Sequence, residues 1–253
     1  MVALFVIVFS VCSEKKNKDT DSEKAPQKTE TAIDVLKKEM AAELNMDDLS
    51  ELESIGPYGA YLADGSEYRG NYGVSDKTLR DFHLYRIRIL DRSNADILAC
   101  ETIPNFQEAR ILSDILFHVD KPVWISFSCK DEQHLNDGSK IKECVSIFRS
   151  HPKVFAVGVN CTNPKYISGI IQCIKASRGD KKIVVYPNSG EAYNAKSKTW
   201  RGLSDPKYFV EMSIEWTKLG ADIIGGCCRI GPEHIRGMSN ELQKRNFEIN
   251  KIG

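Results

Sequence analysis

Three cysteines follow apolar segments that have the composition of buried strands. Cys161 comes directly after VFAVGVN, and Cys227 and Cys228 come directly after ADIIGG. Because the carboxyl ends of parallel strands meet on one face of a barrel, we expect the three thiols to converge. Three thiolates with one vacant position are typical of a catalytic zinc site, whereas four closed ligands are typical of a structural one. The alternative is that each is a small buried apolar residue, the usual role of a free cysteine.

The remaining cysteines and the charge balance narrow the class of protein. A chain of 253 residues with eight cysteines does not need a disulfide framework, so a reducing compartment, the cytoplasm, is predicted. Lys plus Arg and Asp plus Glu both number 35, so nothing in the composition points to a nucleic acid partner. We therefore expect a small-molecule ligand and leave the oligomeric state open. Four other cysteines are predicted to be buried apolar residues: Cys100, Cys129, Cys144 and Cys173.

Short apolar runs alternate with helical patterns over most of the chain. Strands are predicted at Glu53–Pro57, Asp96–Cys100, Val123–Ser128, Val154–Asn160, Ile183–Tyr186 and Asp222–Gly226. Helices are predicted at 76–92, 105–118, 138–149, 164–177, 205–219 and 232–245, with Asn105 and Asp205 as N-caps. An additional amphipathic helix is predicted at Ala32–Leu44. Repeated strand–helix units predict a parallel sheet with right-handed crossovers.

Two architectures fit this alternation, a doubly wound open sheet and a (β/α) barrel. No G-x-G-x-x-G follows the first strand, so a dinucleotide-binding sheet is not favoured. Reactive residues instead follow several different strands, which is typical of a TIM barrel. The prediction is an α/β, TIM-type (β/α)8 barrel, incomplete, with about six recognisable βα units.

The first residues differ in composition from the rest. Residues 1–31 hold an apolar leader and then a polar, charged linker predicted to be disordered, and the barrel domain is expected at 32–253. The apolar run at 2–12 is too short to span a bilayer, so no membrane partner is predicted. If residues 1–12 act as a signal peptide, the alternative location is outside the cell.

Five segments carry a resemblance to the zinc-dependent homocysteine S-methyltransferases, closest to those that use S-methylmethionine or S-adenosylmethionine. They are GPYGAYLADGSEYRGNYG (56–73), ACETIPNFQEA (99–109), GVNCTNP (158–164), VVYPNSGEAY (184–193) and GADIIGGCCRIGPEHI (220–235). This resemblance implies a zinc-containing TIM barrel, an enzyme that methylates homocysteine to methionine. It implies Zn²⁺ ligands at Cys161, Cys227 and Cys228, where the GVNC and GGCC motifs fall. It also implies that the homocysteine thiolate, activated by zinc, attacks the methyl group of a sulfonium donor.

Residues for substrate binding are predicted with less support from spacing. Glu101, in ACET, resembles the family carboxylate that binds the homocysteine ammonium. Its alternative role is an acid near the N-terminus of the helix that follows Pro104. Aromatic faces attract a sulfonium cation, which makes Tyr58 a candidate. Asn188, in PNSGE, is a candidate for ordering the rim or touching substrate.

Two family segments have no match here. An opening strand that ends in Asp-Gly-Gly and a Thr-x-x-Tyr-Gln segment are both absent from the sequence, and six strands are counted where a barrel needs eight. The missing Asp and glycines help to hold the amino acid part of homocysteine in the resembling family. The alternative function is therefore a catalytically impaired remnant that binds zinc or homocysteine.

Overall fold

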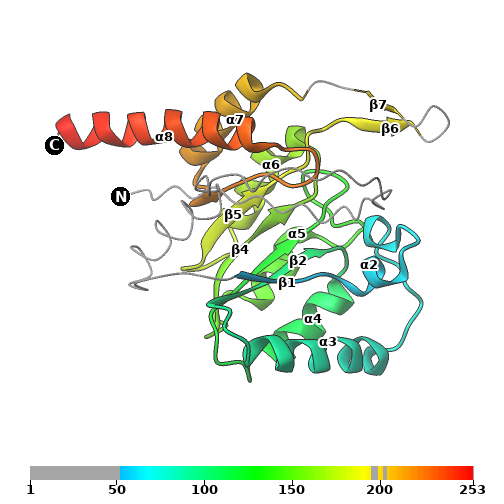
Figure 1. Cartoon of the computed structure of the whole chain (residues 1–253). Helices are drawn as coiled ribbons and strands as arrows, with labels where there is room; N and C mark the ends of the chain where they lie inside the picture. The colour runs from blue at the N-terminus through cyan, green and yellow to red at the C-terminus, as the bar shows by residue number, and fades with distance from the viewer. Residues whose placement is uncertain (1–51, 195–198, 202–203, 253) are drawn as a thin grey trace, which may run out of the picture.

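The computed structural model describes residues 52–194, 199–201 and 204–252 (Figure 1). Six parallel strands form one sheet in the order β1-β2-β3-β4-β5-β8. Their bounds are β1 Leu52–Ile55, β2 Ile97–Ile103, β3 Val123–Phe127, β4 Val154–Asn160, β5 Lys182–Tyr186 and β8 Ile223–Ile224. Spatial order follows chain order throughout, whereas a doubly wound sheet reverses its order at a switch point.

The helices follow the same sequential order outside the strands. They are α2 Tyr58–Leu62, α3 Asp76–Asp91, α4 Phe106–Leu116, α5 Ile141–Ile147, α6 Ile167–Lys175, α7 Pro206–Leu219 and α8 Pro232–Ile252, with short 3₁₀ turns η1 Ser66–Tyr68 and η2 Pro164–Tyr166. From α3 to α8, each helix contacts the next one along the chain. Consecutive strands and consecutive helices as neighbours are the arrangement of a partial TIM-type barrel.

The helices begin where capping residues satisfy their free N–H groups. Asn105 accepts a hydrogen bond from the N–H of Glu108 at the start of α4, and Asp205 accepts one from Lys207 at the start of α7. Both predicted N-caps are confirmed. The strands between these helices are buried along nearly their whole length, β3 at all five positions, as expected for strands covered on both faces.

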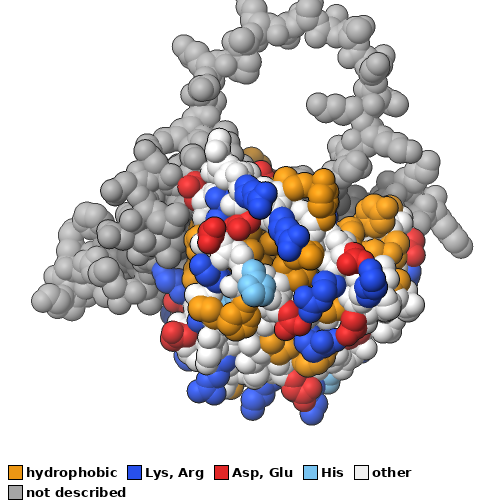
Figure 2. All heavy atoms as spheres, turned by 90° about the horizontal axis from the view of Figure 1, so that it is seen from below, with side chains coloured by type: hydrophobic (Ala, Val, Ile, Leu, Met, Phe, Trp, Pro, Cys, Tyr) orange, Lys and Arg blue, Asp and Glu red, His pale blue; other side chains and the backbone are white. Residues whose placement is uncertain are grey.

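The outer surface of the helices carries mixed charge. On the face seen in Figure 2, basic and acidic side chains are interspersed with apolar ones. Two ion pairs link α3 to α4: Arg80 Nη2 lies 2.7 Å from Asp114 Oδ2, and Arg110 pairs with Asp76. These pairs are solvent-exposed, so each stabilises the fold by at most about 1 kcal/mol.

Within the described residues, β1 and β8 are the two edges of the sheet. This sheet is therefore open between its first and last strands, which is where a full barrel has two more. A separate antiparallel pair, β6 Ala192–Asn194 and β7 Thr199–Arg201, follows β5. In the described part of the chain no helix has the length and hydropathy needed to cross a bilayer.

All six predicted strands are present, with some bounds corrected. The strand predicted to end at Cys100 continues to Ile103, so Glu101 lies inside β2 and not after it. The helix predicted at 138–149 covers only Ile141–Ile147, since a turn with bridges Cys129↔Leu135 and His134↔Lys140 precedes it. Helix α2 and the β6–β7 pair were not predicted. The predicted leader and linker (1–31) and the helix at 32–44 lie outside the described residues.

Candidate metal and substrate site

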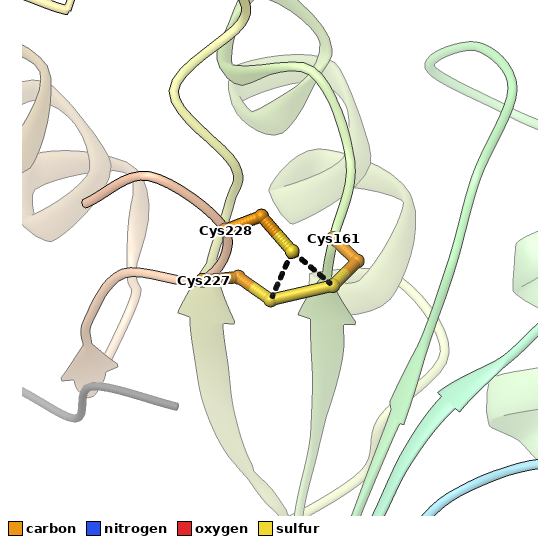
Figure 3. Close-up of side chains that lie close together, drawn as sticks. All are labelled: Cys161, Cys227 and Cys228. Carbon is orange, nitrogen blue, oxygen red and sulfur yellow. Dashed lines mark hydrogen bonds between the residues drawn. A yellow bond between two sulfur atoms is a disulfide. The ribbon is translucent and has the colours of Figure 1, made fainter. Parts of the chain in front are cut away.

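Three cysteine side chains meet at the carboxyl end of the sheet, as the sequence predicted (Figure 3). Cys161 follows the last residue of β4, and Cys227 and Cys228 lie on the loop after β8. The sulfur of Cys228 lies 4.0 Å from that of Cys161 and 3.9 Å from that of Cys227, and all three sulfurs lie within 4.8 Å of one another. Cys161 and Cys227 are joined as a disulfide, with their Cα atoms 5.6 Å apart, and Cys228 is not part of that bond.

The segment after β5 holds the two cysteine-bearing loops together through backbone hydrogen bonds. The N–H of Cys161 donates to the carbonyl of Tyr186, and the N–H of Cys227 donates to the carbonyl of Pro187 over 2.8 Å. The N–H of Ser189 donates to the carbonyl of Cys228 over 3.1 Å. Residues 186–189 therefore set the distance between the loop of Cys161 and the loop of the adjacent pair.

Backbone conformation at this rim is unusual for residues with side chains. Cys161 and Arg229 have φ values of 46° and 65°, in the left-handed region that disfavours a Cβ by about 1–2 kcal/mol. Arg229 is held there by an ion pair, its Nε lying 2.6 Å from Glu191 Oε2. Gly226 allows the loop to close tightly, because a Cβ at this position would lie 2.1 Å from Ile230 Cγ2.

Glu101 is buried beside the thiols and hydrogen-bonded at both oxygens. Its side chain accepts from Ser54 Oγ at Oε1, and from the Tyr186 hydroxyl at Oε2 over 3.0 Å. The residue is 4% exposed, and burial raises the pKa of its carboxyl. Glu101 thus stands four residues before the N-cap Asn105, inside the sheet, which does not fit its alternative role at a helix N-terminus.

A polar network continues from Glu101 across the interior of the sheet. Ser126 Oγ lies 2.5 Å from the Tyr186 hydroxyl and donates to Asn160 Oδ1 over 2.9 Å. The same Asn160 oxygen accepts from the N–H of Thr102 over 2.7 Å, and its Nδ2 donates to Thr102 Oγ1. Five strands each contribute at least one group to this network, and Asn160 directly precedes Cys161. Buried polar groups this well paired fix one arrangement of the rim.

A pocket opens between these groups and the glycine-rich segment that follows β1. The carboxyl groups that line it are those of Glu67 and Glu101, and no Lys, Arg or His of the described residues is among its lining. Its lining residues are Ser54, Gly56, Pro57, Ala60, Glu67, Tyr68, Glu101, Thr102, Asn160, Cys161, Cys227 and Cys228. The electrostatic character of this pocket therefore favours a cationic ligand.

The glycine-rich segment is held over the pocket by a buried carboxylate, Glu108. This side chain accepts from the backbone N–H of Tyr58 over 2.7 Å and from the Tyr72 hydroxyl over 2.9 Å. The Nε2 atom of His83 lies 2.7 Å from Glu108 Oε1, with both side chains fully buried. Burial and the Glu108 carboxylate raise the pKa of Tyr72, so its hydroxyl keeps the proton that it donates. Gly59 permits the close packing, because a Cβ there would lie 2.5 Å from the Glu67 nitrogen.

The family is decided by comparison with known proteins. The model of the family described as "Homocysteine S-methyltransferase" matches residues 8–242. The chain belongs to the homocysteine S-methyltransferase family. Homocysteine S-methyltransferase YbgG of Bacillus subtilis is 46% identical over 184 residues, which cover 72% of this chain and 58% of that protein. The selenocysteine methyltransferase of Astragalus bisulcatus is 45% identical over 192 residues, covering 73% of this chain and 56% of that protein. This chain therefore spans less than two thirds of the length of these relatives.

Solved structures of the family have the same fold. The homocysteine methyltransferase MmuM from Escherichia coli matches in a metallated form with a TM-score of 0.66 and 34% identity, covering 83% of this chain and 68% of MmuM. Its oxidized form matches with a TM-score of 0.67 at the same identity and coverage. The predicted family and the partial TIM-type barrel are both confirmed.

The predicted site residues lie in three different environments. Cys161, Cys227, Cys228 and Glu101 line one pocket. Tyr58 is not among the residues lining that pocket, and its ring packs 5.1 Å from the ring of Phe82. Asn188 is half-buried, its N–H donates to the carbonyl of Thr162 and its Oδ1 accepts from the N–H of Gly190. A contact of Tyr58 or Asn188 with substrate stays a prediction.

The structure also identifies site residues that the sequence reading missed. Glu67 lines the pocket, and Ser54, Ser126 and Asn160 belong to its polar network. The one available signal for Asn160 was its place immediately before Cys161. Of the four cysteines predicted to be buried, three are buried and Cys173 is half-buried.

Proposed function

We propose that this chain is a zinc-dependent homocysteine S-methyltransferase that takes its methyl group from a sulfonium, S-methylmethionine or S-adenosylmethionine. The observation that carries this proposal is the convergence of three cysteine sulfurs within 4.8 Å in a pocket that also holds Glu101. Family membership adds support, since the relatives named above act on homocysteine or selenocysteine according to their names.

The three sulfurs fit a zinc ion. Once reduced, Cys161, Cys227 and Cys228 would hold the ion through soft thiolate ligands, and all three line the pocket from which a substrate would reach it. Zinc binds thiolates, so the bond between Cys161 and Cys227 must be reduced before all three ligands are available. When bound, zinc would stabilise the thiolate form of homocysteine at neutral pH.

Glu101 is proposed to hold the homocysteine ammonium in the same pocket. Ser54 and Tyr186 donate hydrogen bonds to its two oxygens and so fix its orientation from β1 and β5. A carboxylate already oriented in this way loses little further freedom when it binds a cation. Burial favours the neutral acid of Glu101, whereas an ammonium beside it would favour the ionised form.

The proposed reaction transfers a methyl group between two sulfur atoms. The homocysteine thiol gives up its proton to solvent, and its sulfur forms a bond to the donor methyl carbon. The bond between that carbon and the donor sulfur breaks, and the donor sulfur keeps the electron pair and becomes neutral. The chain's contribution is to hold both reactants in line, an arrangement that supplies much of the rate enhancement in such displacements.

A second candidate function is zinc or homocysteine binding without turnover. The observation that favours it is the open side of the sheet between β1 and β8 in the described residues. Strand edges without a neighbouring strand at this position would admit water beside the pocket.

The deciding experiment is methionine formation by the purified chain, supplied with zinc, a thiol reductant, homocysteine and S-methylmethionine. We expect turnover that disappears on addition of a chelator and returns with zinc. A folded, zinc-loaded chain that forms no methionine would leave the binding function as the better account. S-adenosylmethionine in place of S-methylmethionine identifies the preferred donor.

We also propose that the chain works in the cytoplasm, with secretion as the alternative. Support comes from the chemistry of the site, because a reducing compartment keeps the thiols of Cys161 and Cys227 available for zinc. The redox state of these cysteines in protein trapped rapidly from cells tests this: fully oxidised cysteines would argue for an oxidising compartment.

A further inference from the structure

Glu67 differs from the other carboxylate of the pocket in its hydrogen bonding. Both oxygens of Glu101 are occupied, by Ser54 and by Tyr186. The Oε2 atom of Glu67 is buried and has no hydrogen-bond partner, although the residue lines the same pocket as the three thiols. A buried polar oxygen without a partner costs free energy, and a cationic ligand at this position would offset that cost.

The backbone around Glu67 is fixed, so its side chain has a defined place over the pocket. The Glu67 carbonyl accepts from Asn136 Nδ2 over 3.2 Å and from Ser128 Oγ over 3.4 Å. Its N–H side packs directly against Gly59, where a Cβ would clash at 2.5 Å. These contacts tie η1 both to the loop after β3 and to α2, independently of any ligand.

We propose that Glu67 contacts the positively charged sulfur of the methyl donor and thereby selects cationic donors. This inference rests on the proposed function, and it assigns the two pocket carboxylates to different charges: Glu101 to the homocysteine ammonium and Glu67 to the sulfonium. A sulfonium has no N–H to donate, so it interacts with a carboxylate through charge alone, and the Oε2 atom of Glu67 is not oriented toward a hydrogen-bond donor. Tyr68, next in the chain and also lining the pocket, offers an aromatic face suited to the same cation.

Charge selection at this position also favours product release. When the methyl group leaves, the donor sulfur keeps the bonding pair and becomes a neutral thioether. The attraction between Glu67 and the sulfur then disappears, while the contacts to the rest of the molecule stay. Glu67 therefore holds the donor before transfer more strongly than the product after it.

The test compares two ligands that differ at the sulfur. Isothermal titration calorimetry measures how tightly the full, zinc-loaded chain binds S-methylmethionine and methionine, each in the absence of homocysteine. The difference between the two affinities gives the contribution of the sulfonium charge to binding. We expect Glu67→Gln to weaken S-methylmethionine binding by about tenfold, the loss of one effective charge contact, and to leave methionine binding unchanged. Glu143→Gln, which removes an exposed carboxylate on α5, is the matched control and should change neither affinity.

Other outcomes overturn the inference. An equal loss of affinity for S-methylmethionine and methionine would place the ammonium of the ligand beside Glu67. No loss of affinity for either ligand would show that Glu67 takes no part in donor binding. Zinc content and circular dichroism of Glu67→Gln show that the variant is folded and loaded. The proposed function fails separately: a wild-type chain that forms no methionine, but binds S-methylmethionine in a Glu67-dependent way, refutes the activity and leaves this inference standing. Wild-type protein that binds no S-methylmethionine refutes both.

Discussion

The hydroxyl of Tyr186 donates to Oε2 of Glu101 over 3.0 Å, joining β5 to β2 beneath the three thiols. Both groups are buried, and Ser126 lies 2.5 Å from the same hydroxyl. This bond sets the orientation of the carboxylate that is proposed to hold homocysteine. Its removal should therefore affect one substrate and spare the other.

Tyr186→Phe should raise the KM for homocysteine and leave the KM for the donor unchanged. The variant leaves Oε2 of Glu101 without its donor, which should lower the free energy of unfolding by about 1–3 kcal/mol. Steady-state kinetics with each substrate varied in turn, and urea unfolding, measure the two effects. Equal changes in both KM values would show that Tyr186 shapes the whole pocket and not Glu101 in particular.

Glu101→Gln should make stability less dependent on pH. Burial raises the pKa of Glu101 above its ordinary value of 4.5, so the folded state favours the protonated acid. The contribution of Glu101 to stability is then fully present below its ordinary pKa of 4.5 and is lost as pH rises through the higher pKa of the folded state. From pH 4 upward, the free energy of unfolding of Glu101→Gln should increase relative to that of the wild type as pH rises. If the free energies of unfolding of the two proteins changed in parallel with pH, the raised pKa of Glu101 would be contradicted.

Cys228→Ser should lose zinc while the chain stays folded. Loss of a supporting group near a metal typically weakens binding by about 10–100-fold, and loss of a direct ligand should exceed that range. Zinc content after gel filtration and competition with a chelator measure the effect. Cys173→Ser is the matched control, since it removes a half-buried thiol from α6 outside the site. Retention of zinc by Cys228→Ser would refute the ligand assignment.

Glu191→Gln should weaken zinc binding without touching a ligand. The Glu191 carboxylate holds Arg229, which directly follows Cys228 and has a φ of 65°. Without that ion pair the loop relaxes, and zinc affinity should fall by about tenfold. Glu241→Gln breaks a comparable pair with Arg245, at 3.0 Å on α8, and should leave zinc binding unchanged. If the two variants changed zinc affinity by the same small amount, the ion pair of Glu191 with Arg229 would have no specific effect on the metal site.

Glu108→Ala should destabilise the fold far more than Asp114→Ala. Glu108 is fully buried and paired with His83, whereas Asp114 forms an exposed pair with Arg80, although both pairs join α3 to α4. Removal of one partner of a buried pair costs about 3–5 kcal/mol, against at most about 1 kcal/mol at the surface. Chemical unfolding of the two variants gives the comparison. Similar values would mean that the buried pair adds no more than the exposed one.

The sequence predicted the parts of the site that local patterns determine. A buried strand is marked by its apolar run, so the places of Cys161, Cys227 and Cys228 at strand ends followed directly, and so did their convergence. The caps Asn105 and Asp205 were readable because capping depends on residues close in the chain. Short elements such as α2 and β6 have no periodicity long enough to detect.

Long-range partnerships could not be read in the same way. The bond from Tyr186 to Glu101 joins residues 85 positions apart, and Ser54 reaches Glu101 across 47. Nothing in the local sequence of Ser54 or Glu67 distinguishes an inward-facing polar side chain from a solvated one. The end of β2 was misplaced because Glu101 and Thr102 are polar residues inside a strand, where polar residues ordinarily mark its end.

The network beneath the thiols has a consequence for how the chain folds. Its groups come from β1, β2, β3, β4 and β5, so no pair of neighbouring strands contains it. Each bond closes a long loop. Contacts between distant residues form late, because closing the loop between them costs conformational entropy before the contact stabilises the chain. Neither the carboxylate nor the loop of Cys161 therefore reaches its final orientation until the last of these strands has docked. Zinc capture during refolding should accordingly lag behind the appearance of helix.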